Sequence, residues 1–76
     1  MEKEQIVSRA LMIVGGYAFM PNAGNVCVTH MQEPCRSTLM RPNGEVLETS
    51  MEDVELEIVG DLWRRNRNLY EEMSNA

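Results

Sequence analysis

The sequence has little of what usually indicates a secreted or membrane protein. It contains two cysteines, one lysine and 5% aromatic residues. Two cysteines are too few for the disulfide scaffold of a small secreted domain. The longest purely apolar run, residues 10–14, is far too short to cross a membrane. Acids precede this run and there is no basic n-region, so no signal peptide is predicted, and we expect a cytoplasmic protein with reduced thiols.

Catalytic and cofactor motifs are also missing. Neither G-x-x-x-x-G-K-[ST] nor G-x-G-x-x-G occurs, so no phosphate-binding loop is predicted. Cys27, His30 and Cys35 are irregularly spaced and lack an evident fourth ligand, which argues against zinc. A Cys–His nucleophile would need a cation beside the thiol, and Arg36 is expected on the other face of its strand. We therefore expect a protein that is not an enzyme and holds neither metal nor cofactor.

The two cysteines are expected to be free thiols. If residues 31–34 connect two antiparallel strands, Thr38 lies opposite Cys27, and Cys35 is then roughly 10 Å away along the partner strand. A disulfide requires Cα atoms within about 7 Å. This register therefore excludes a bridge between Cys27 and Cys35.

The composition is that of one small globular domain. The chain has 76 residues, of which 43% are hydrophobic and 25% are charged. We expect residues 1–76 to form a single compact domain with a loose C-terminal tail at 74–76. A chain of this length buries only about 60% of its unfolded surface, so its core is small.

The first predicted element is a helix over residues 2–14. Its apolar residues recur at three- and four-residue spacings, and Gly15-Gly16 is expected to end it with a left-handed cap. Residues 25–31 are rich in β-branched side chains and predict a strand. Residues 17–20 fit either a strand paired with it or an exposed loop, and Pro21 to Gly24 supply turn residues between them.

A hairpin is the clearest local signal. Arg41-Pro42-Asn43-Gly44 has the residues of a type I turn followed by a left-handed glycine, and it joins predicted strands over 35–40 and 45–49. Ser50 is expected to cap a last helix that reaches about residue 73, with Asp53 completing a capping box. Its expected central apolar stripe comprises Met51, Val54, Ile58, Leu62, Leu69 and Met73, flanked by Val59, Trp63 and Tyr70.

The predicted fold class is therefore α+β with two layers. The order is an N-terminal helix, an antiparallel meander of three or four strands, and a C-terminal helix (α-β-β-β(-β)-α). Both helices have one apolar face, so the simplest packing places both on the same face of the sheet.

Charge suggests where a partner would bind. The net charge is −5, which disfavours nucleic acid as a ligand. Seven acids and no base lie within residues 45–61, which fits a solvated face or a docking surface for a basic protein. The predicted partner-binding residues are the acids Glu52, Glu55, Glu57 and Asp61 with the apolar anchors Tyr17, Phe19 and Met20. The wide apolar face of the last helix favours a homodimer.

The only basic cluster allows two interpretations. Arg64, Arg65 and Arg67 have the side chains that grip phosphate groups, so they could hold an anionic ligand such as a nucleotide between subunits. Asp61 and Glu71 lie three or four residues away, which favours simple pairing along the helix. The same arginines offer a third interpretation, a regulator that contacts nucleic acid.

In size, acidity and lack of motifs, the chain resembles the small orphan proteins of phages and mobile elements. Many proteins of that general type bind a host protein and block it. The leading hypothesis is therefore a non-enzymatic protein-binding module, an inhibitor of a nucleic-acid-handling or defence protein. An oligomeric binder of an anionic ligand is the alternative.

Overall fold

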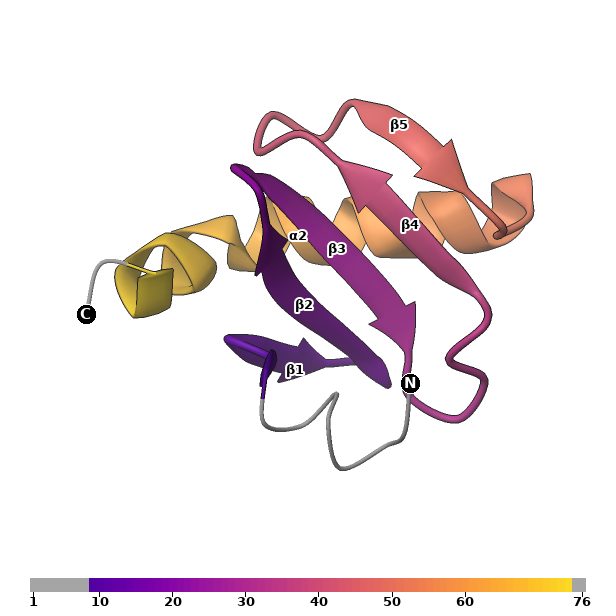
Figure 1. The fold of residues 1–76 in the computed structure, drawn as a ribbon, viewed down its shortest axis with the longest axis horizontal. Helices are drawn as coiled ribbons and strands as arrows, with labels where there is room; N and C mark the ends of the chain where they lie inside the picture. The colour runs from indigo at the N-terminus through magenta and orange to yellow at the C-terminus, as the bar shows by residue number, and fades with distance from the viewer. Residues whose placement is uncertain (1–8, 75–76) are drawn as a thin grey trace.

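The computed structural model describes residues 9–74. Within them, five strands form one antiparallel meander in the order β1-β2-β3-β4-β5, and one helix runs across a face of the sheet (Figure 1). The elements are β1 (Met12–Val14), β2 (Tyr17–Asn22), β3 (Asn25–His30), β4 (Ser37–Met40), β5 (Val46–Thr49) and α2 (Asp53–Ser74). The α+β class, the antiparallel meander and the C-terminal helix are thus confirmed, but the meander has five strands rather than the predicted three or four. Residues 2–8 of the predicted N-terminal helix lie outside the described residues.

The C-terminal part of that predicted helix is wrong, because Met12–Val14 is a strand. Gly15 and Gly16 do not cap a helix. They are the two central residues of the β1–β2 turn, with φ of +61° and +84°. Val14 pairs with Tyr17 on either side of them. Positive φ at both central positions is what a two-residue hairpin needs, because its twist then matches that of the strands.

The uncertain segment over residues 17–20 is a strand, and it extends to Asn22. Asn22 pairs with Asn25, so the β2–β3 turn contains only Ala23 and Gly24. Both have positive φ, +50° and +86°. Ala23 is the one non-glycine residue with positive φ in the described chain. The first two hairpins therefore share one turn geometry.

The β4–β5 hairpin around residues 41–44 is confirmed. The backbone N–H of Gly44 donates to the carbonyl of Arg41 at 2.8 Å, and φ of Gly44 is +95°. The expected register between β3 and β4 is wrong by one residue, because Cys27 pairs with Leu39 rather than with Thr38. The connection is longer than expected, since β4 begins only at Ser37.

Helix α2 begins at Asp53, three residues later than expected. Ser50 does not cap it. The Ser50 hydroxyl instead donates to the carbonyl of Cys35 at 2.7 Å and accepts from the N–H of Ser37 at 3.0 Å. It ties the end of β5 to the start of β4. The helix ends at Ser74, so the rest of the predicted tail lies outside the described residues.

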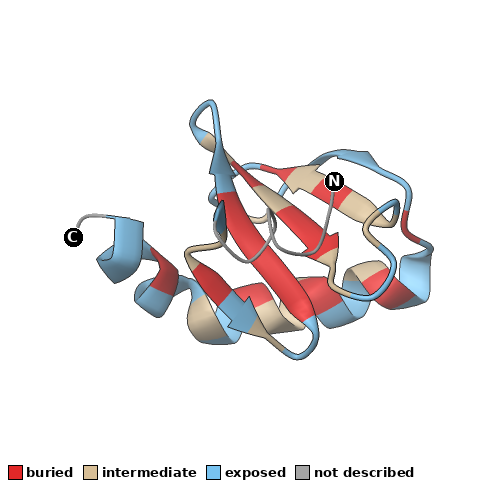
Figure 2. Cartoon of the chain, turned by 60° about the horizontal axis from the view of Figure 1, so that its bottom comes forward, coloured by how far each residue is buried: buried red, intermediate tan, exposed pale blue. Residues whose placement is uncertain are grey.

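The main core lies between the sheet and α2. Figure 2 shows buried residues along the central strands and on the sheet-facing side of the helix. The Trp63 ring stacks on Phe19 at 6.0 Å and meets Tyr70 edge-on at 5.1 Å, and its Nε1 donates to the carbonyl of Pro42 at 3.0 Å. The core comprises Met12, Tyr17, Phe19, Val26, Val28, Met40, Met51, Val59, Trp63 and Tyr70.

The expected centre of the helix stripe is wrong. Val59, Trp63 and Tyr70, which were expected on its flank, are the buried residues of α2 together with Glu55. Most of the expected central stripe is exposed. The helix is therefore rotated so that its largest aromatic side chain, Trp63, fills the space over the sheet.

Candidate functional site

An apolar stripe is the most unusual surface feature of α2. We use the term apolar stripe for Val54, Ile58, Leu62, Leu69 and Met73. Val54 is 71% exposed, and Ile58, Leu69 and Met73 are 47–49% exposed, while Leu62 is partly buried beside Gly15. Large side chains that are so exposed along one side of one helix mark an interaction surface more often than scattered ones do.

An acidic band borders the stripe near the start of α2. It consists of Glu52, which directly precedes the helix, and of Asp53, Glu57 and Asp61 within its N-terminal half. The first three are exposed and make no ion pair with any of residues 9–74. Asp61 lies 3.2 Å from Arg65 Nε and 3.6 Å from Arg64 Nη2. The negative charge of the band is thus largely uncompensated at one end of the helix.

Glu55, which the sequence placed in this acidic surface, is buried instead. The Tyr17 hydroxyl donates to Glu55 Oε2 at 2.7 Å, and Arg36 Nε and Nη2 approach Oε1 at 2.9 and 2.7 Å. The hydrogen bond from Tyr17, followed by the contact with Arg36, lowers the pKa of Glu55 against the opposing effect of burial. Burial and the bond to Glu55 raise the pKa of Tyr17 from 10.0 to about 12.

The same network fixes the β3–β4 connection. Arg36 Nη1 also contacts Glu33 Oε2 at 3.1 Å, and the Glu33 and Glu55 contacts raise the pKa of the guanidinium. The His30 Nδ1 accepts the backbone N–H of Gln32 at 3.2 Å and of Glu33 at 3.1 Å. The His30 ring also meets Tyr17 edge-on at 5.3 Å. These contacts attach the connection to α2, and they give His30 a structural role.

The predicted apolar anchors lie inside the fold. Tyr17 and Phe19 belong to the core under α2, and Met20 is buried with Ala18 on the other side of β2. Side chains alternate along a strand, so β2 contributes to both faces of the sheet. None of the three residues offers exposed surface to a partner. The exposed apolar stripe is the surface that the sequence assigned to the core.

The three arginines of the basic cluster form ion pairs along α2, as the pairing interpretation predicts. Besides the contacts of Asp61, Arg67 Nη2 lies 3.4 Å from Glu71 Oε1. Arg64, Arg65 and Arg67 therefore each have an acidic neighbour one turn away on α2. All three are exposed, and such pairs contribute little to stability. An anionic ligand would have to compete with these carboxylates.

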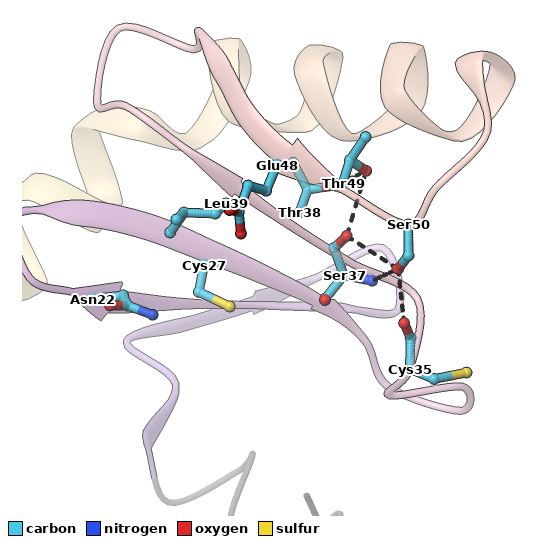
Figure 3. A pocket seen from close by; sticks show the side chains of 9 residues that line it. All are labelled: Asn22, Cys27, Cys35, Ser37, Thr38, Leu39, Glu48, Thr49 and Ser50. Carbon is cyan, nitrogen blue, oxygen red and sulfur yellow. Dashed lines mark hydrogen bonds between the residues drawn. The ribbon is translucent and has the colours of Figure 1, made fainter.

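A shallow pocket of about 460 Å³ lies on the sheet. The register places Cys27, Leu39 and Glu48 side by side on one face of it. Figure 3 shows Cys35 at one end of this pocket, beside Ser50, and Cys27 further along the sheet. Both cysteines are free thiols in the structure. Among residues 9–74, no three His, Cys, Asp or Glu side chains are grouped to hold a metal ion.

Two features of the sequence point to the network of Glu55 and Arg36. Arg36 directly follows Cys35 in a segment without other bases, and Glu55 is the acid of α2 that lies on the same helix side as Val59. An acid on the buried side of a helix indicates a partner across the core. Sequence alone does not show that this partner is supplied by Tyr17 and Arg36.

Comparison with known proteins gives one match. No curated protein and no solved structure matches the chain. Within the described residues, no helix is both long enough and apolar enough to traverse a lipid bilayer. The sequence matches a family described as a family of unknown function (DUF7723) over residues 1–70, which is most of its length. The chain belongs to this family.

Proposed function

We propose that this protein is a non-enzymatic binding module that acts by covering a basic surface of another protein. The observation that carries the proposal is the acidic band. Glu52, Asp53 and Glu57 are exposed and lack a cationic partner among the described residues. A partner with arginines or lysines at its rim would supply the missing charge, and complementary charge accelerates association.

The rigidity of α2 also supports this proposal. The network of Glu55, Tyr17 and Arg36 holds the first turns of α2 against the sheet. A rigid surface loses less conformational entropy on binding. Steric blocking of the covered partner, as in an inhibitor, would be the mode of action.

Charge reversal tests the proposal. A Glu52→Lys/Glu57→Lys variant changes the acidic band, and Glu71→Lys/Glu72→Lys makes the same change in net charge at the other end of α2. We expect proteins from the source organism to be captured by the wild type and the second variant but not by the first. With a captured protein purified, surface plasmon resonance should show association slowed about tenfold for the first variant, with a weaker salt dependence.

The Glu71→Lys/Glu72→Lys variant serves as the control, and two outcomes would contradict the proposal. If both variants retain every captured protein with equal kinetics across the salt series, the acidic band is not a binding surface. If both lose binding equally, net charge rather than the band is responsible. Either result contradicts the proposal.

A further inference from the structure

The residues of the apolar stripe are spaced symmetrically along α2. Starting from Val54, steps of four residues lead to Ile58 and Leu62, a step of three leads to Arg65, and two steps of four lead to Leu69 and Met73. The order of steps is the same when it is read from either end. All six positions lie on one side of the helix, because steps of three and four follow the helical repeat.

Such a pattern is complementary to itself. When two copies of α2 lie antiparallel about a two-fold axis, Val54 meets Met73 of the second copy and Ile58 meets Leu69. Each pair then joins two exposed apolar side chains. A two-fold interface requires this reciprocity, since each patch contacts its own image.

Charge at the centre fits the same arrangement. The two-fold axis passes between positions 62 and 65. Arg65 of one copy therefore lies over Leu62 of the other copy and beside Asp61 of that other copy. Asp61 already lies 3.2 Å from Arg65 within its own chain. In the pair, two aspartates and two arginines alternate around the axis, and opposite charges become neighbours in both copies.

We infer that the apolar stripe binds a second copy of this chain, through antiparallel contact of the two α2 helices. The contact covers the stripe and includes Asp61. It leaves Glu52 outside, because Glu52 precedes α2, and Asp53, because Asp53 lies on a different side of the helix. The inference does not rest on the proposed function.

Directed crosslinking tests the antiparallel register. In a Cys27→Ser/Cys35→Ser background, one protein carries Ile58→Cys and another carries Leu69→Cys. Both positions are about half exposed, so neither substitution should disturb the fold. Under mild oxidation we expect a covalent dimer when the two proteins are mixed and little when either is oxidised alone. In the antiparallel pair, positions 58 of the two copies are roughly 16 Å apart at the rise of an α-helix.

The oligomeric state provides the second measurement. Sedimentation of the wild type should give about twice the chain mass of 8.7 kDa. Ile58→Asp should raise the dimer dissociation constant at least tenfold, because an unpaired carboxylate would be desolvated. Leu47→Asp, a comparable change at an exposed residue of β5, should leave it unchanged. A monomeric wild type, or crosslinking that is equally strong for each protein alone, would overturn the inference.

Discussion

Glu55 is the residue whose environment differs most from its neighbours in sequence. It lies in a run of acids, yet its two carboxylate oxygens are held by Tyr17 and Arg36 in the interior. A buried carboxylate needs both charge and hydrogen bonds to offset its lost hydration, and this one has both. The Tyr17 hydroxyl comes from β2 and the Arg36 guanidinium from the β3–β4 connection. Glu55 thereby joins three parts of the chain.

The titration of Glu55 gives a prediction for acid stability. Its pKa is lowered in the folded protein relative to the ordinary value of 4.5. The contribution to stability is therefore present above about pH 4.5, and it is lost as the pH falls through the folded pKa. Glu55→Gln should be less stable than the wild type at pH 7, and the difference should shrink progressively below pH 4.5. Urea unfolding between pH 2.5 and 7 measures both.

The control for this experiment is Glu48→Gln, which removes an exposed carboxylate of β5 and leaves the network intact. Its stability should run parallel to that of the wild type throughout the series. A Glu55→Gln variant that also runs parallel to the wild type would show that the carboxylate contributes nothing through its charge.

At the scale of elements, local chemistry decided which predictions succeeded. The turn at residues 41–44 is determined locally, because Pro42 fixes its own φ and Gly44 permits the positive φ that the turn needs. Gly15-Gly16 fits both a helix cap and a two-residue hairpin turn, and three residues of strand are too few to separate a period of two from one of 3.6. The helical spacing of the apolar residues over 2–14 therefore extends the predicted helix into residues 12–14, where the structure has β1.

The candidate site was predicted only in part, because tertiary packing determines which side of α2 is buried. The sequence of α2 has two adjacent apolar stripes, and their lengths predict that the longer one faces the core. In the structure, the side of α2 that carries Trp63 and Glu55 packs against the sheet. Trp63 stacks there on Phe19, and Glu55 accepts a hydrogen bond from Tyr17. Such long-range pairing has no local signature. Glu57 and Asp61 were correctly expected on the last helix, whereas Glu52 directly precedes it. Their relation to the exposed stripe was not predicted.

The β2–β3 turn provides the prediction at this scale. Ala23 adopts a positive φ of +50°, which costs free energy for an alanine. Asparagine tolerates this conformation better, and Asn-Gly is the preferred pair for such a turn. Ala23→Asn should therefore stabilise the protein by part of the left-handed cost of about 1–2 kcal/mol, measured by urea unfolding. As a control, Ala18→Asn at a buried strand position should destabilise it. A loss of stability in Ala23→Asn would show that the alanine is not strained.

At the scale of the whole molecule, the main core joins α2 to strands β1 to β4. Trp63, the only tryptophan, stacks on Phe19 of β2 and donates to Pro42 in the turn between β4 and β5. Leu62 contacts Gly15 in the β1–β2 turn, and Glu55 holds the β3–β4 connection through Arg36. The helix therefore cannot separate from the sheet without breaking contacts to the β1–β2, β3–β4 and β4–β5 connections.

This arrangement predicts that helix and sheet unfold together. Fluorescence of Trp63 reports the interface, and circular dichroism at 222 nm reports α2, so their urea transitions should have the same midpoint. The Ile58→Asp variant is the appropriate protein, since dimer dissociation would otherwise make the midpoint depend on concentration. If the helix signal persisted after the Trp63 signal had changed, α2 would be stable without the sheet, and the buried network of Glu55, Tyr17 and Arg36 could not be what fixes it in place.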